Sequence, residues 1–154
     1  MKKFVFTLLL VFVCHLGYAQ GINGLFNEFG SEKNADCVKV SSFMMSLGKM
    51  FAGHDEDAKI IRKIKSIKVL DLESCTASVK ERFNKKVNKL NLKGYDELMR
   101  VNDEGEKVRV LMKTKKETIR ELLFVCTGKE DCTLVQINGK FTKDDIDKLV
   151  NQET

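Results

Sequence analysis

The spacing of the apolar residues changes once along this chain, and that change most constrains the fold. From Tyr95 onward, apolar residues alternate with polar ones, which is the pattern of a half-buried β-strand. Short polar turns, such as 103–105, separate the alternating runs. The pattern predicts four consecutive antiparallel strands, at 97–101, 107–114, 118–126 and 132–138. The C-terminal half is therefore expected to form a four-strand meander.

Helical spacing dominates the first half of the chain and returns at its end. It predicts helices at 21–30, 43–51, 55–64 and 78–90, and a last helix after Thr142. Ser78 and Glu81 have the spacing of a capping box. Phe141 and Ile146 have the spacing of a hydrophobic staple around Thr142. Two short alternating runs predict further strands, at 35–40 and 66–72.

These elements predict a single α+β domain over 20–154. Its sheet is mostly antiparallel, with two N-terminal strands and the C-terminal four-strand meander, and its helices pack on one face. The last two strands carry apolar residues on both faces, so they belong in the sheet centre or beneath a covered second face. One face is expected to hold Leu123, Val125, Val135 and Ile137, and the other Leu122, Phe124 and Leu134.

Residues 1–19 carry the features of a secretory signal peptide. A basic start precedes an apolar stretch at 4–13, and small residues mark a cleavage site before Gln20. The stretch is shorter than the roughly 20 residues that a membrane span needs. Cys14 raises the alternative of a lipid anchor, but Val13 precedes it, where a lipobox has Gly or Ala. We therefore expect export to the periplasm or the extracellular space, without a membrane span.

Five cysteines are present, and one of them lies in the predicted leader. Four cysteines in an exported chain predict two disulfides. The preferred pairs are Cys37–Cys75 and Cys126–Cys132. A four-cysteine zinc site and free or redox-active thiols are the alternatives, although no C-x-x-C spacing is present.

The expected register of the last hairpin is consistent with a Cys126–Cys132 pair. If Cys126 stands opposite Cys132, apolar residues on the two strands also face each other, and both sulfur atoms lie on one side of the sheet. That register sets Phe124 opposite Leu134 and Leu123 opposite Val135.

Few residues have a pattern that indicates catalysis or metal binding. His54 is the only histidine beyond the leader, and it begins the acidic run 54–57. Adjacent ligands seldom converge on one ion, and no metal-binding spacing or G-x-S-x-G elbow is present. We therefore predict no catalytic, cofactor-binding or metal-binding residues. The alternative is a small metal-dependent hydrolase that uses His54 and the neighbouring acids.

The charge pattern and the methionine content bear on possible interaction surfaces. Loss of Lys2 and Lys3 with the leader lowers the formal net charge from +5 to +3. Because acids are interspersed among the lysine runs, these runs indicate a solvated face and no nucleic-acid partner; contact with an anionic membrane or lipopolysaccharide is the alternative. An apolar helix face is a possible interaction surface or a part of the core, and it comprises Phe43, Met44, Met45, Met50 and Phe51.

Several segments together resemble a known family. They include 25–29 (LFNEF), 43–47 (FMMSL), 94–99 (GYDELM) and 134–139 (LVQING). They are similar to the small exported bacterial proteins grouped as domain of unknown function 4252. The resemblance covers nearly all of 20–154 and implies no activity, cofactor or site residue.

The expectation for function is an exported, non-enzymatic binding protein of the cell envelope. Its partner would be a protein or another envelope component. A homo-oligomer that uses an exposed strand edge, such as 95–101, is a further possibility.

Overall fold

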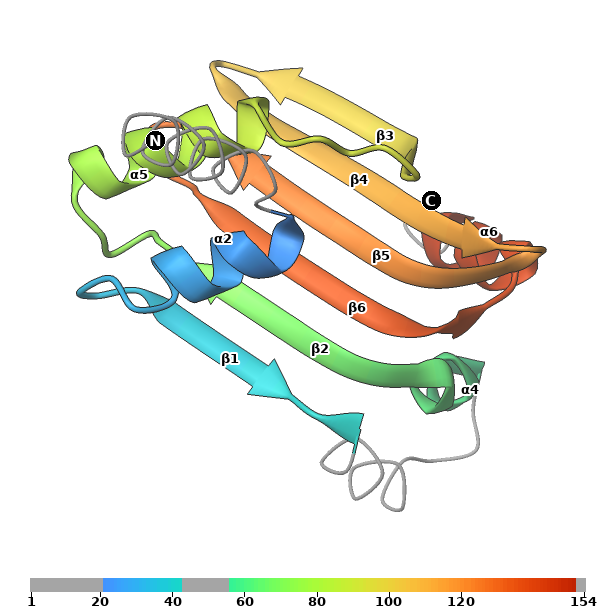
Figure 1. The fold of residues 1–154 in the computed structure, drawn as a ribbon. Helices are drawn as coiled ribbons and strands as arrows, with labels where there is room; N and C mark the ends of the chain where they lie inside the picture. The colour runs from blue at the N-terminus through green and yellow to red at the C-terminus, as the bar shows by residue number, and fades with distance from the viewer. Residues whose placement is uncertain (1–20, 43–55, 152–154) are drawn as a thin grey trace, which may run out of the picture.

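A computed structural model of the chain describes residues 21–42 and 56–151. Their strands form one six-stranded antiparallel sheet in the order β1-β2-β6-β5-β4-β3 (Figure 1). The strands are β1 (Asp36–Val40), β2 (Ile64–Asp71), β3 (Asp96–Asp103), β4 (Glu106–Lys115), β5 (Thr118–Thr127) and β6 (Thr133–Phe141). β6 lies between β2 and β5, so it joins the N-terminal hairpin to the meander. The predicted α+β class and all six predicted strands are confirmed.

Four helices accompany this sheet in the described part of the chain. They are α2 (Ile22–Phe29), α4 (Glu56–Lys63), α5 (Ala77–Asn88) and α6 (Lys143–Asn151). The expected packing on one face holds for α2 and α5, which cross the front of the sheet in Figure 1. α4 and α6 instead contribute to a second apolar cluster, on the opposite face. None of these four helices is long and apolar enough to cross a membrane.

The larger core lies between the sheet and the helix pair α2–α5. Phe29 and Phe83 meet edge to face, with their ring centroids 5.4 Å apart. Beneath them, fully buried leucines project from three neighbouring strands. These leucines are Leu70 of β2, Leu134 of β6 and Leu123 of β5.

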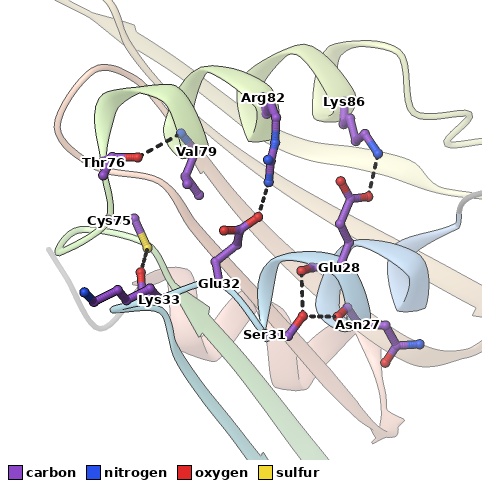
Figure 2. Close-up of polar contacts among 10 residues, drawn as sticks. All are labelled: Asn27, Glu28, Ser31, Glu32, Lys33, Cys75, Thr76, Val79, Arg82 and Lys86. Carbon is purple, nitrogen blue, oxygen red and sulfur yellow. Dashed lines mark hydrogen bonds and ion pairs between the residues drawn. The ribbon is translucent and has the colours of Figure 1, made fainter.

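Polar contacts align α2 with α5 at the edge of this core (Figure 2). Glu32 pairs with Arg82, and Glu28 pairs with Lys86. α5 begins with Thr76 as its N-cap, whose hydroxyl accepts a hydrogen bond from the amide of Val79 at 3.4 Å. The predicted cap at Ser78 is therefore wrong. The helix starts earlier, because the hydroxyl of Thr76 caps it two residues before Ser78.

The second cluster confirms the predicted start of the last helix. The Thr142 amide donates to the carboxylate of Asp145 at 2.7 Å, and the Asp145 amide donates back to the Thr142 hydroxyl at 3.3 Å. This reciprocal pair is a capping box. Phe141 and Ile146 flank it and are both buried in the same cluster, as a hydrophobic staple requires.

The expected register of the β5–β6 hairpin is wrong by one residue. Phe124 pairs with Val135, and Cys126 pairs with Thr133. A shift of one residue moves every side chain of β6 to the other face of the sheet. Leu134 thereby joins Leu123 and Val125 in the core beneath α2 and α5. The opposite face carries Leu122, Phe124, Val135 and Ile137.

Phe83→Ala should lower the free energy of unfolding by about 3–5 kcal/mol, because it leaves a cavity beneath α5. Urea denaturation followed by circular dichroism measures this change. Val101→Ala, at a side chain that is 46% exposed, is the control and should stay within about 0.5 kcal/mol of wild type. Equal losses in both variants would contradict the assignment of the core to the α2–α5 face.

Candidate functional site

The sheet face opposite α2 and α5 carries a continuous apolar stripe. Because cross-strand partners stand on the same face, the pairing defines two rows. The first row crosses all six strands and consists of Val38, Val69, Val135, Phe124, Val110 and Met99. The second row crosses five strands and consists of Val40, Ile67, Ile137, Leu122 and Met112. We refer to these eleven residues as the apolar stripe.

The apolar stripe is only partly covered. In the described structure, α4 and α6 cover the part around Leu122 and Ile137. Val38 is 55% exposed, Met99 49% and Phe124 37%. Val110, between Phe124 and Met99 in the first row, is buried, so the exposed part of the stripe is interrupted there. Exposed apolar patches mark many binding surfaces.

An apolar groove lies where α4 meets this stripe. Its volume is about 320 Å³. Every lining side chain among residues 21–42 and 56–151 is aliphatic or aromatic: Ile60, Ile61, Ile64, Leu122, Phe124, Ile137 and Phe141. Ile61 is 42% exposed and forms part of the open side, whereas Phe141 is fully buried. The groove is thus an open apolar site at one end of the stripe.

A second cavity, the basic pocket, lies beside the groove. Its volume is about 420 Å³, and Ile60 borders both cavities. Among the described residues, four basic side chains and one carboxylate line it together with Ile60, namely Lys59, Arg62, Lys63, Lys148 and Asp145. Both cavities lie within the range of about 300–1,000 Å³ that is usual for small-molecule sites.

An ion pair holds α4 and α6 together at the basic pocket. The Lys63 ammonium lies 2.6 Å from both carboxylate oxygens of Asp145. Burial alone would raise the pKa of Asp145, but hydrogen bonds from Lys63 and Thr142 outweigh this effect and lower it. Asp145 is therefore ionised at neutral pH and anchors α4 against the capping box of α6.

The backbone of α4 also approaches β6 closely. A Cβ atom on Gly139 would lie 2.5 Å from the Lys63 carbonyl oxygen and 2.7 Å from the Phe141 ring. Only a residue without a side chain fits at this junction. The C-terminal end of α4 therefore lies directly against the backbone of β6.

Some of the predicted candidate residues lie outside the described ranges, and the others lie within them. The possible interaction surface, comprising Phe43, Met44, Met45, Met50 and Phe51, lies outside the described residues, and so does His54. Within 21–42 and 56–151, no group of three or more His, Cys, Asp or Glu side chains is placed to hold a metal ion. The strand edge predicted at 95–101 is found as β3, at the margin of the sheet and exposed along its whole length.

All four cysteines of the described chain are free thiols in this structure. The observed register separates Cys126 from Cys132: the former projects with Phe124, and the latter is buried in the α2–α5 core. Cys75 donates to the Lys33 carbonyl at 3.5 Å (Figure 2). Burial raises the pKa of Cys75 and Cys132, so both thiols are protonated and weakly nucleophilic at neutral pH.

Sequence reasoning missed both cavities, although their signals are present. Ile60, Ile61 and Ile64 form an apolar face that reads as ordinary core packing. The lysine-rich run 62–65 reads as a solvated surface. The two cavities form only because α4 packs across the end of the sheet, and that packing cannot be seen in either sequence pattern.

Asp145→Asn should lower the free energy of unfolding by about 1–2 kcal/mol at pH 7, since Lys63 is partly exposed and its ion pair is screened. The pKa of Asp145 is lowered in the folded chain, so its contribution is present above the ordinary carboxyl pKa and is lost as pH falls through the lowered value. Wild type and variant should therefore converge in acid. Chemical denaturation between about pH 2 and 7 measures this. Asp144→Asn is the control, and a pH-independent gap would contradict the ion pair.

Comparison with known proteins supports one assignment. The model of the family described as "Domain of unknown function (DUF4252)" matches residues 29–149. No curated protein and no solved structure matches the chain significantly. The matched segment includes β1 through most of α6 and both cavities, which is well over half of the chain. The chain therefore belongs to the DUF4252 family.

Proposed function

We propose that this chain is an exported, non-enzymatic binding protein of the cell envelope that holds an acyl chain in the apolar groove. The observation that carries this proposal is the open groove between α4 and the sheet, whose lining in the described part of the chain is apolar throughout. At about 30 Å³ per water-sized group, a volume of about 320 Å³ accepts about ten methylene groups. A single acyl chain of this length therefore fits the groove.

The chemistry of the lining supports binding over catalysis. Isoleucine, leucine and phenylalanine side chains hold an apolar ligand but neither transfer protons nor attack a carbonyl. The hydrolase alternative depends on His54, which the described structure does not include. Hydrolysis of an acyl ester by the purified chain, abolished by chelation of metal, would favour that alternative.

The predicted leader supports export, and export supports a disulfide between Cys37 and Cys75. Both residues lie at the corner between α2 and β1: the Cys37 sulfur lies 3.1 Å from the position of a Cβ on Gly30, and Cys75 donates to the Lys33 carbonyl. The pairing of Cys126 with Cys132 loses its support, because the two side chains project to opposite faces.

A neutral fluorescent probe, N-phenyl-1-naphthylamine, tests the acyl-chain groove directly. Binding should enhance its fluorescence, and dodecanol should displace it. Ile61→Asp should weaken probe binding about tenfold or more, because it places a charge at the rim of the groove. Val38→Asp lies on the same sheet face at a more exposed side chain outside the groove, and it should bind as wild type does. Equal losses in both variants would refute the location.

Intact-protein mass spectrometry of chain isolated from envelope fractions tests export and oxidation. The mass should correspond to a start at Gln20, with a non-reducing mass lower by two hydrogen atoms. Cys37→Ser and Cys75→Ser should each remove that difference and cost up to about 4 kcal/mol of stability. Cys126→Ser should keep the difference. A start at an acylated Cys14, or four alkylatable thiols in the native chain, would contradict this proposal.

A further inference from the structure

We propose that the apolar groove selects its ligand by chain length, and that Phe141 is the wall against which the methyl end of the chain stops. This inference rests on the proposed acyl-chain groove and adds the residue that limits the chain. The ligand class is a single unbranched chain of about ten carbons, whose polar end stays at the open side of the groove.

The lining side chains become less exposed along the groove. Ile61 and Phe124 are exposed, whereas Leu122 and Phe141 are buried. Leu122 lies two residues before Phe124 on β5, and Phe141 lies at the end of β6. In the described part of the chain, the groove therefore opens beside Ile61 and Phe124 and deepens toward Phe141.

The ring of Phe141 projects into the groove because Gly139 has no side chain. A Cβ atom on Gly139 would lie 2.7 Å from two carbon atoms of that ring. Gly139 precedes Phe141 by two residues on β6, so the two positions face the same side of the sheet. The ring therefore leans back along β6 over Gly139, in the direction of Ile137 and the open side.

Other contacts hold this ring in place. Phe141 pairs with Ile119 of β5 and is buried in one cluster with Ile146 of α6. The capping box between Thr142 and Asp145 fixes the start of α6 directly after it. Because close packing leaves a buried aromatic ring little room to change its rotamer, Phe141 forms a firm end to the groove.

The length of the groove agrees with its volume. Phe124 stands opposite Val135, and from Val135 to Gly139 the β6 strand advances four residues, which is about 14 Å. An extended chain of single bonds advances about 1.2 Å per bond, since three bonds of an extended peptide span about 3.3–3.6 Å. Ten methylene groups therefore span about 12 Å, which fits between the rim at Phe124 and the ring over Gly139.

The same geometry orients the ligand. The described lining contains no polar side chain, so a hydroxyl or carboxylate group that was buried against Phe141 would lose its hydrogen bonds to water. The chain therefore enters with its methyl end first, and its polar end remains in water beside Ile61 and Phe124.

A series of n-alkyl maltosides, from hexyl to tetradecyl, tests the length limit by displacing N-phenyl-1-naphthylamine from the purified full chain. Each compound is used below its micellar concentration, and the strongly hydrated headgroup is constant. Affinity should rise about fourfold for each added methylene up to about decyl, because each one buries the same apolar area. Beyond that length, the gain should fall below about twofold for each methylene. A fourfold rise across the whole series would overturn the length limit.

Substitutions in the groove test the role of Phe141. Phe141→Leu shortens the wall and should move the break in the series by about two methylenes toward longer chains. Phe83→Leu makes the same change in the α2–α5 core and should leave the break unchanged. Ile137→Phe fills the groove midway and should move the break to shorter chains, so the wall can be tested even if Phe141→Leu does not fold. Unchanged breaks in folded groove variants, as judged by circular dichroism, would refute the assignment of the wall.

A comparison of 1-decanol with 1,10-decanediol tests the orientation. The diol must place one hydroxyl group against Phe141, so it should displace the probe about tenfold less well than decanol, or worse. Equal displacement would contradict entry by the methyl end, because it would require both ends of the groove to be open to water.

The outcomes separate this inference from the proposed function. If the maltosides displace the probe without any break in the series, the length inference fails and the acyl-chain groove stands. If neither the probe nor any alkyl compound binds, the proposed function itself fails.

Discussion

The burial of Leu134 is the constraint on which the rest of the sheet depends. Leu134 pairs with Leu70 on one side and with Val125 on the other, and all three side chains are buried beneath α2 and α5. Because β6 bonds to both β2 and β5, this choice fixes which residues of all six strands face the helix pair. The apolar stripe on the opposite face is the complementary consequence of the same register.

The second face is organised differently, through a few contacts at one end. Lys63 and Asp145 join α4 to α6, while Phe141 and Ile146 seal the start of α6. This small cluster covers one end of the stripe and leaves the remainder open. The two cavities arise at that boundary, where a charged helix surface adjoins an apolar sheet.

The order of the described elements could be predicted, and their limits to within about three residues, because the periods of 2 and 3.6 residues are strong local signals. The register of the last hairpin could not. Phe124, Val125, Leu134 and Val135 are all apolar, so either pairing satisfies the local pattern, and only the packing of Leu134 on α2 and α5 decides. The groove was equally hidden, since the position of α4 depends on contacts with β6 and α6 that are distant in sequence.

The close approach at Gly139 helps to position α4 without involving the side chains that form the open side of the groove. The Lys63 carbonyl, at the end of α4, meets β6 where no side chain intervenes. This main-chain contact and the Lys63–Asp145 ion pair together position α4. Neither contact involves the partly exposed lining residues Ile61 and Phe124. Substitutions at these two positions would therefore change the size and shape of the groove and leave both of these contacts intact.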